Sequence, residues 1–454
     1  MTKFVEPGSV GGALAAPASK SATQRAVACA LLAAGKSRLL GPGRSDDCLA
    51  ALGVAAALGA GVEDDGASWS IRGVGAASPG PLAAASAAKP FAPAPTRPPA
   101  ENEPAGSGPD RELRCGESGL ALRMFSPIAA LFPGETRLLA SGSLRNRPVS
   151  MLEAPLRALG AACSTEGGLP PVTVRGPLSG GRAAVDGGES SQFLTGLLVA
   201  LPLAEGDSLL EVERLASAGY VDLTIDTMRA FGVEVDVEPA GEGRRYRVRG
   251  RQAYAARDFR IEGDWSGAAF PLVAAAIAGR AEGLLVGNLG ADSLQPDRGV
   301  VEALVSAGAA VEWAGDGLRV RPAPLRAFRF DARQRPDLFP PLAVLAAAAE
   351  GESRILGAGR LRAKESDRAA SVTDCLRALG VEAWVEGDEM RIRGVGPAGR
   401  FSGGRVDARG DHRIAMAAAV AALAAEAPVE ILGAECVAKS WPAFYEDLAA
   451  VVGR

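Results

Sequence analysis

A repeated pattern constrains the fold of this chain more than any other feature. Five segments run from the end of a helical stretch through a glycine into two short strands joined by a turn, and they start at Ala57, Ala158, Ala230, Ser306 and Ala378. Glycine suits the position just past a helix end, because it adopts a positive φ without a Cβ clash. Alternation such as that of residues 233–237 predicts a half-buried strand. The repeating unit is therefore a helix followed by a β-hairpin.

The spacing of the units locates an insertion. The glycines that end the helices are Gly59, Gly160, Gly232, Gly308 and Gly380, and they lie 101, 72, 76 and 72 residues apart. The first interval is about 29 residues too long, and residues 76–109 supply the excess. This segment is rich in Ala and Pro and lacks periodicity, a composition that predicts a flexible surface loop rather than a packed element.

A sixth unit is cut short by the end of the chain. Gly453 lies about 72 residues after Gly380 and ends a helical stretch, but no hairpin follows it. Residues 1–19 are the natural source of the missing strands. We therefore expect two domains of three units each, residues 1–19 with 262–454 and residues 20–261, and a chain that crosses between them twice. Two unrelated α+β domains that share only their turn chemistry are the alternative.

Composition excludes several classes of function. His412 is the one histidine, which rules out a His-rich metal site and any mechanism that needs two histidines. A formal net charge of −4 argues against nucleic acid as the main partner. The apolar stretch 414–425 is too short to span a bilayer and predicts a buried helix. With no signal peptide in view, we expect a cytoplasmic protein without a membrane partner. We expect reduced thiols at Cys29, Cys48, Cys115, Cys163, Cys375 and Cys436, since none lies in a CxxC pair.

Polar residues recur where helices are expected to start. They lie at 20–25, 141–148, 190–192, 364–368, 411–413 and Lys439. Taken singly, each is typical of a capped or solvated helix start. Lys364 and Arg368 are four residues apart and would share a helix face. Taken together on an acidic chain, these segments indicate a site for a multiply anionic small molecule. Asp337 and Glu365 stand among the cations and could act as base and acid, although Asp337 could also serve only as a helix cap.

The order of these motifs resembles that of the 5-enolpyruvylshikimate-3-phosphate synthase family (3-phosphoshikimate 1-carboxyvinyltransferases). The resemblance covers nearly the whole chain outside 76–109. It rests on SKSATQR (19–25), SDD (45–47), LRNRP (144–148), SSQFLTGLL (190–198), SAGYVDLT (217–224), EGD (262–264), PD (336–337), KESDR (364–368), DHRIAMA (411–417) and AKSWP (438–442).

The resemblance implies a fold and a reaction. The fold is α/β, with two inside-out, barrel-like domains of three βαβαββ repeats each and an active site in the cleft between them. The reaction transfers the enolpyruvyl group of phosphoenolpyruvate to the 5-hydroxyl of shikimate 3-phosphate, on the pathway to chorismate and the aromatic amino acids. It proceeds by addition and elimination, with no metal or cofactor. These two small molecules are the expected partners, and we expect a monomer.

The resemblance also implies roles for individual residues. Asp337 should accept the 5-hydroxyl proton and Glu365 should act at the methylene carbon, with Lys20 and Lys364 as further catalytic residues. Shikimate 3-phosphate should be bound by Lys20, Ser21, Arg25, Ser190, Ser191, Gln192, Ser217, Tyr220, Asp337 and Lys364. Phosphoenolpyruvate should be bound by Lys20, Gly119, Arg147, Gln192, Arg368, Arg413 and Lys439.

Several positions depart from the family pattern. Where the family reads Asn-Ala-Gly-Thr, this chain has Glu117, Ser118, Gly119 and Leu120. An expected asparagine four residues before Lys364 is Arg360, and the one before Asp411 is Gly410. Ser217 is followed by Ala218 and Gly219 instead of a basic residue and proline. We expect retained activity with an altered affinity for phosphoenolpyruvate and for its phosphonate mimic glyphosate.

Three alternatives stay open at this point. A sister enolpyruvyl transferase acts on UDP-N-acetylglucosamine, but it carries a reactive cysteine in the loop that aligns with 141–148, and this loop has none. Cys115 lies elsewhere and is not a substitute. A non-catalytic paralogue that binds a shikimate-like ligand and a paralogue from a secondary pathway are the others. The intact Asp337, Lys364 and Glu365 argue against a non-catalytic protein.

Overall fold

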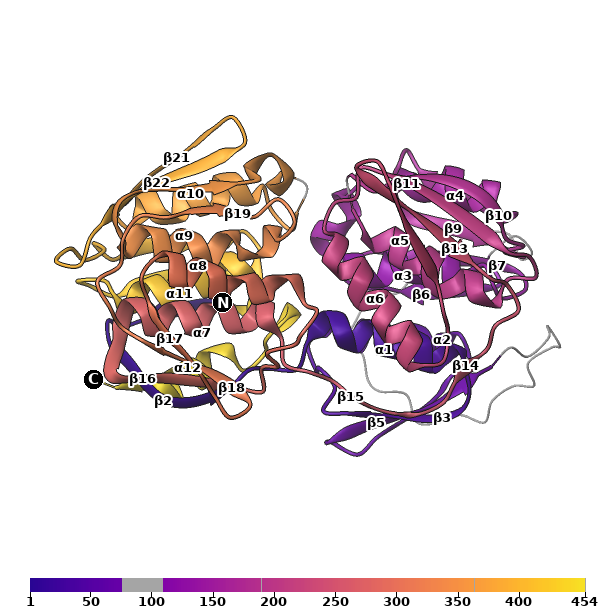
Figure 1. Cartoon of the computed structure of the whole chain (residues 1–454), viewed down its shortest axis with the longest axis horizontal. Helices are drawn as coiled ribbons and strands as arrows, with labels where there is room; N and C mark the ends of the chain where they lie inside the picture. Colours follow the sequence, from indigo (N-terminus) through magenta and orange to yellow (C-terminus); the bar gives the residue numbers. More distant parts are fainter. Residues whose placement is uncertain (76–108, 189, 363, 454) are drawn as a thin grey trace, which may run out of the picture.

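The chain forms two lobes that lie side by side (Figure 1). The structure is a computed structural model and describes residues 1–75, 109–188, 190–362 and 364–453. Each lobe has its own hydrophobic core. One core collects buried side chains from Ala22 to Ile261, and the other collects Val10, Ala16 and buried side chains from Trp265 to Val451. The insertion expected at 76–109 lies, apart from Pro109, outside the described residues.

The repeat expected from the sequence is the unit of both lobes. A unit consists of a strand, a helix, a second strand parallel to the first, a second helix and an antiparallel hairpin that completes the sheet. In the second unit these are β6 (Arg111–Arg114), α3 (Gly119–Ala129), β7 (Glu135–Leu139), α4 (Glu153–Ala158), β8 (Ala162–Glu166) and β9 (Leu169–Arg175), with sheet order β6-β7-β9-β8.

The same order recurs in the other units. The third unit has β10 (Gly181–Asp186), α5 (Gln192–Ala200), β11 (Ser208–Glu213), α6 (Ala218–Ala230), β12 (Asp236–Ala240) and β13 (Gly243–Val248). The fourth has β2 (Ser9–Ala15), α7 (Trp265–Ala278), β16 (Gly279–Gly287), α8 (Val300–Ser306), β17 (Ala310–Ala314) and β18 (Gly317–Arg321). The fifth has β19 (Arg329–Asp331), α9 (Phe339–Ala348), β20 (Glu350–Leu356), α10 (Arg368–Ala378), β21 (Glu382–Glu386) and β22 (Glu389–Val395).

The first and sixth units are completed by distant parts of the chain. The first has α1 (Lys20–Leu32), β3 (Ala33–Leu40), α2 (Asp46–Ala57), β4 (Gly61–Asp64) and β5 (Ser68–Val74), and β14 (Tyr254–Ala255) and β15 (Asp258–Arg260) run parallel to β3. The sixth has β23 (Gly404–Asp407), α11 (His412–Leu423), β24 (Val429–Leu432) and α12 (Phe444–Val451), and β1 (Thr2–Val5) pairs antiparallel with β24. Thus the N-terminal segment supplies a strand to the truncated unit, as expected.

Three sequence predictions differ in detail from the structure. β2 joins the sheet of the fourth unit, so only β1 fills the gap in the sixth. Gly453 follows the end of α12 by two residues, as expected, but it lacks the positive φ of the other five glycines and lies in β25 (Val452–Gly453), which pairs with β2. The strand expected at 233–237 begins only at Asp236, because Val233 and Val235 point into the core from the loop that leaves α6.

The predictions for helix ends and for the apolar stretch are confirmed. The five helix-ending glycines have φ between +82° and +104°, each two residues after the last helical residue. All twelve residues of α11 are buried, and α7, α9 and α11 pack against one another inside their lobe. Helices inside and sheets outside make each lobe an inside-out α/β domain. No helix of the described residues is long and apolar enough to cross a membrane.

The chain passes between the lobes twice, at adjacent positions. Ala18 forms a bridge with Gly263, and the Ser19 amide donates to the Glu262 carbonyl at 2.8 Å. The two connections therefore leave the lobes together and place the starts of α1 and α7 next to each other. This arrangement brings helix starts from both lobes to one side of the crossing.

Candidate active site

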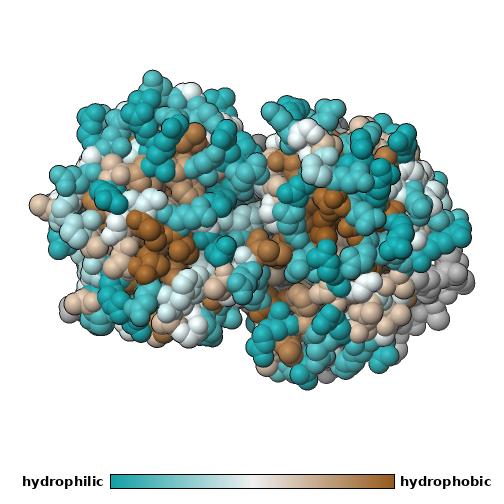
Figure 2. Space-filling view, in the orientation of Figure 1, coloured by the Kyte–Doolittle hydropathy of each residue, from teal (hydrophilic) through white to brown (hydrophobic). Residues whose placement is uncertain are grey.

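A cleft of about 890 Å³ is lined by residues of both lobes. Figure 2 shows the notch between the lobes, with largely hydrophilic residues along its rim. Most of the site residues expected from the sequence lie in its walls, namely Lys20, Ser21, Arg25, Gly119, Arg147, Ser190, Ser191, Gln192, Ser217, Tyr220, Asp337, Lys364, Glu365 and Arg413. Arg368 and Lys439 lie outside this set.

The start of α1 provides one wall of the cleft. Ser19 caps the helix by accepting from the Ala22 amide at 3.3 Å. Lys20 Nζ lies 2.9 Å from Asp47 Oδ2. Burial alone would lower the pKa of Lys20, but the neighbouring Asp47 carboxylate raises it above its ordinary value. Lys20 is therefore a firmly protonated cation that already has a carboxylate partner.

Arg25 ties α1 to α6. Its Nε donates to Thr224 Oγ1 at 2.8 Å, and its Nη1 and Nη2 donate to the carbonyls of Ser21 and Tyr220. The side chain is 2% exposed, and burial lowers its pKa to about 10, so it stays charged at neutral pH. Arg25 therefore holds the two helix starts at a fixed separation while contributing positive charge to the cleft.

Arg368 holds three carboxylates behind the cleft. Its guanidinium is fully buried and donates to Asp337 at 2.8 Å, to Glu365 at 2.5 Å and to Asp411 at 2.9 Å. Arg413 Nη2 donates to the other oxygen of Asp337 at 3.1 Å. Asp337 lies within η5 (Pro336–Leu338) and bonds these arginines, so the alternative that it serves only as a helix cap is wrong.

The two carboxylates of the cleft are held ionised. Burial opposes ionisation of Asp337, but Arg413, Lys364 and Arg368 outweigh it and hold its pKa well below the ordinary value. Burial likewise opposes ionisation of Glu365, and Arg368, Arg147 and Lys439 again prevail, so its pKa is well below the ordinary value. Both groups can therefore accept a proton, provided that an incoming anion first weakens the field of the arginines.

Lys364 is a cation of the cleft with a lowered pKa. Burial lowers its pKa to about 8, against the opposing pull of Asp337. The expected helical face shared by Lys364 and Arg368 does not form, because α10 begins at Arg368. Asp367 caps this helix by accepting from the Ala370 amide at 3.2 Å. Lys364 thus lies in the preceding loop, where it faces the cleft.

Hydroxyl groups line the opposite wall. Ser190 Oγ accepts from the Gln192 amide at 3.2 Å where α5 begins. Ser217, at the start of α6, has φ +57° and accepts a hydrogen bond from Arg360 Nη1 at 3.3 Å. Arg360 reaches Ser217 from η6 (Ala358–Leu361) of the other lobe. This wall therefore combines hydroxyl donors with a cation.

Tyr220 makes a further contact between the lobes. Its hydroxyl donates to Asp297 Oδ2 at 2.9 Å, from α6 to η4 (Pro296–Gly299). Burial, with the charge of Asp337 second, raises the pKa of Asp297 to about 6. Burial also raises the pKa of Tyr220 well above its ordinary value, so the tyrosine is the donor in this bond.

Lys439 lies in an adjoining cavity of about 610 Å³, which shares Asp47 with the main cleft. Its Nζ lies 3.7 Å from Glu117 Oε2 and makes no hydrogen bond to a described residue. Glu117 accepts from the amide and hydroxyl of Ser143 at 3.1 and 2.9 Å. The departure at Glu117 therefore places a carboxylate against an otherwise unsatisfied cation.

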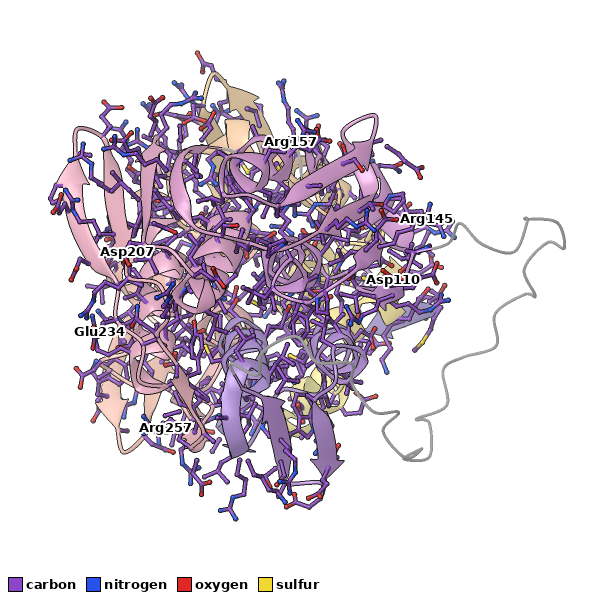
Figure 3. All side chains as sticks on the ribbon, turned by 90° about the vertical axis from the view of Figure 1, so that its right-hand side faces the viewer. Asp110, Arg145, Arg157, Asp207, Glu234 and Arg257 are labelled. Atoms are coloured by element: carbon purple, nitrogen blue, oxygen red, sulfur yellow. The ribbon has the colours of Figure 1, made fainter. Side chains whose placement is uncertain are left out.

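The two arginines of the polar loop at 141–148 lie in different surroundings. Arg147 lines the cleft, and its Nη1 lies 3.9 Å from Glu365 Oε1. Arg145 is exposed on the outer surface, as are the other labelled side chains of Figure 3, namely Asp110, Arg157, Asp207, Glu234 and Arg257. Of these two arginines, only Arg147 can therefore bind a ligand in the cleft.

Sequence reasoning missed several lining residues, namely Gln24, Asp47, Asp264 and Ser266. Asp47 and Asp264 belong to the SDD and EGD motifs, so their position at the start of an apolar helix is the signal that could have found them. Asp264 caps α7 by accepting from the Ser266 amide at 2.9 Å. Among the described residues, no group of three or more His, Cys, Asp or Glu side chains could hold a metal ion. All six cysteines are free thiols.

Comparisons with known proteins identify the family of the chain. The family model described as EPSP synthase (3-phosphoshikimate 1-carboxyvinyltransferase) matches residues 5–86 and 99–448. A 3-phosphoshikimate 1-carboxyvinyltransferase of Aeropyrum pernix is 40% identical over 99% of this chain and 95% of its own length. One from Methanocorpusculum labreanum is 36% identical over 99% and 98%. The EPSP synthase structure from Acinetobacter baumannii superposes with a TM-score of 0.76 at 28% identity, covering 99% of this chain and 98% of its own. The chain thus belongs to the EPSP synthase family.

Proposed function

We propose that the chain transfers the enolpyruvyl group of phosphoenolpyruvate to the 5-hydroxyl of shikimate 3-phosphate and releases phosphate. The observation that supports this most is the convergence of cationic and hydroxyl side chains from both lobes around Asp337 and Glu365. Two multiply charged anions repel each other in water. Fixed cations in a cleft remove that repulsion and hold the reactants in contact.

Some of the cations that line the cleft are paired with carboxylates of the chain itself. Lys20 pairs with Asp47, and Arg413 pairs with Asp337. Phosphate and carboxylate groups of the substrates carry the same kind of acceptor oxygen, so they can take over these donors. When an anion engages Arg413 and Arg147, the positive potential at Asp337 and Glu365 falls. Their pKa values then rise toward the range in which they exchange protons with substrate.

Roles for the two carboxylates follow from this change. Asp337 accepts the proton of the 5-hydroxyl as its oxygen forms a bond to carbon 2 of phosphoenolpyruvate. Glu365 takes up a proton when bound phosphoenolpyruvate raises its pKa, and it delivers this proton to the methylene carbon in the addition. In the elimination, Glu365 takes a proton back from the resulting methyl group as the bond between carbon 2 and the phosphate oxygen breaks, and Asp337 passes the proton of the 5-hydroxyl to the released phosphate. Lys20 and Lys364 stabilise the charge on the tetrahedral species, and Arg368 keeps both carboxylates in place from behind.

The proposal extends to the organisation of the molecule. We place one domain at residues 1–19 and 262–454 and the other at 20–261, since the two connections between the lobes pair at Ala18 and Gly263. We propose that the chain works as a monomer, because both walls of the cleft come from the same chain, and that it works in the cytoplasm.

Phosphate release from phosphoenolpyruvate with different acceptors tests the proposed reaction. Release should depend on shikimate 3-phosphate and should be absent with UDP-N-acetylglucosamine. Release that requires UDP-N-acetylglucosamine would instead identify the sister activity. Binding of both substrates without any release would identify a non-catalytic paralogue.

A further inference from the structure

Arg360 is a cation of the cleft whose guanidinium keeps some of its N–H donors unused. Its Nη1 donates to Ser217 Oγ at 3.3 Å and to the carbonyl of Arg333. Its Nε and Nη2 make no hydrogen bond to a described residue, and no described carboxylate forms an ion pair with it. The guanidinium is therefore fixed on one side and open on the other, where it lines the cleft.

This arrangement is unlike that of the neighbouring cations. Arg413 is bonded to Asp337, and Lys20 to Asp47, whereas Arg360 is partly buried and is attracted by Asp337 and Asp388 only from beyond ion-pair distance. A charge withdrawn from water is costly unless an opposite charge approaches it. The open edge of Arg360 is therefore suited to an anion that comes with the ligand and not with the chain.

The residues around Arg360 indicate which anion this is. Ser190, Ser191 and Ser217 share the cleft with it. Several hydroxyl donors together with a guanidinium match a tetrahedral phosphate, which offers several acceptor oxygens and can accept two parallel bonds from one arginine.

Two departures of the sequence meet at this point. The basic residue expected directly after Ser217 is replaced by Ala218, and the asparagine expected on the other lobe is replaced by Arg360. In the folded chain Arg360 touches Ser217 itself. Arg360 of one lobe thus places a positive charge beside Ser217, where the other lobe lacks the expected basic residue.

We infer that Arg360 binds the 3-phosphate of shikimate 3-phosphate, together with Ser190, Ser191 and Ser217, and gives this chain its preference for the phosphorylated substrate. The inference rests on the proposed function. Because Arg360 and Ser217 belong to different lobes, the same phosphate would also hold the cleft closed over the reactants.

Calorimetric titration of the whole chain with shikimate 3-phosphate and with shikimate tests this role. Arg360→Asn should weaken binding of shikimate 3-phosphate about tenfold or more, the size expected for a lost charge-assisted hydrogen bond. Binding of shikimate should change less than about twofold. Adding Ala218→Lys to this variant should restore part of the lost affinity. Arg362→Asn is the matched control, because Arg362 is an exposed arginine two residues away that does not line the cleft.

Equal losses for the two ligands, or a loss no greater than that of Arg362→Asn, would overturn the inference. If Arg360→Asn does not fold, Arg360→Lys decides in its place. A lysine keeps the charge but not the paired donors, so an unchanged ratio of the two affinities would also overturn it. If the unmodified chain does not bind shikimate 3-phosphate, the proposed function itself fails, and this inference fails with it.

Discussion

At the scale of single residues, several cations of the cleft are paired with carboxylates of the chain. Lys20 faces Asp47, and Arg413 faces Asp337. Substrate anions have to displace these carboxylates, and the displaced carboxylates then become able to move protons. Binding and proton transfer are thus carried by the same side chains.

Asp337 is the residue on which the reaction should depend most. Asp337→Asn keeps the shape of the side chain but removes the base, so kcat should fall by about 10²- to 10⁴-fold. Steady-state kinetics measures the loss, and thermal unfolding verifies that the variant folds. Asp331→Asn is a suitable control, because Asp331 is an exposed aspartate paired with Arg333. A near-normal kcat for Asp337→Asn would show that this residue is not the base.

Glu117 should weaken the binding of phosphoenolpyruvate, because its carboxylate competes for Lys439 at 3.7 Å. Replacing Glu117→Asn together with Leu120→Thr should lower the KM for phosphoenolpyruvate about threefold to fivefold, a modest change because Glu117 is 42% exposed. Glu166→Asn, an exposed carboxylate paired with Arg137, should leave this KM unchanged. The idea fails if the KM and the inhibition constant of glyphosate both stay the same in the double variant.

Lys364 should make substrate binding depend on pH. Its pKa is lowered to about 8 in the folded chain, and substrate anions should raise it again. Binding of shikimate 3-phosphate at pH about 8.5 should therefore take up protons, and affinity should fall as the pH rises through that range. Titration calorimetry in buffers of different ionisation enthalpy measures this uptake. Lys364→Arg should abolish the dependence, because arginine stays protonated. An uptake that persists in Lys364→Arg would assign it to another group.

The same shift affects stability, with a definite sign. Between the folded pKa of about 8 and the ordinary value of 10.5, the unfolded chain binds more protons at Lys364 than the folded chain does. The contribution of Lys364 to stability therefore rises with pH across this window. Below pH 8 the lysine is charged in both states, and its burial carries the full cost of desolvation.

Sequence could supply the identity of most residues in the cleft but not their partners. The motifs predict that Arg368 is a substrate ligand, but they do not show that its guanidinium bonds Asp337 and Glu365 from behind. The orientation of this side chain depends on Asp411, 43 residues further along the chain. Such a contact between two loops leaves no local pattern.

At the scale of elements, helix starts carry the chemistry, and their caps determine which residues reach the cleft. Asp367 caps α10, which begins at Arg368, so Lys364 lies in the loop before the helix. Asp411 caps α11 and at the same time accepts from Arg368. The repeat and its glycines could be read from the sequence, because a helix end followed by a positive φ has a residue signature. The residue at which α10 starts could not be predicted from the sequence, because several polar residues there can act as the helix cap.

Asp411 should therefore matter for stability more than its surface counterparts. Asp411→Ala removes a fully buried partner of Arg368 and should lower the free energy of unfolding of its lobe by about 3–5 kcal/mol. Asp374→Ala is the control, because it breaks an ion pair with Arg409 that is about half exposed, and it should cost less than about 1 kcal/mol. Denaturant unfolding followed by fluorescence compares the two. Equal decreases in the free energy of unfolding for the two variants would show that the buried ion pair contributes no more to stability than the exposed one.

At the scale of the whole molecule, the lobes already touch across the cleft. Tyr220 bonds Asp297, and Gln334 Oε1 accepts from the Ala218 amide at 3.0 Å. The period of about 72 residues predicts two lobes and the return of the N-terminus to the last unit. It could not predict that β1 and β2 enter different sheets, because strand pairing between distant segments depends on how the sheets close.

Phosphorus NMR of the enzyme mixed with equimolar phosphoenolpyruvate and shikimate 3-phosphate follows both substrates and both products of the proposed transfer at once. The signals of the two substrates should decline together. Inorganic phosphate and one new phosphomonoester should appear in equal amounts, and Asp337→Asn should slow both by the same factor. Phosphate that appears without consumption of shikimate 3-phosphate, or substrate signals that do not change, would contradict it.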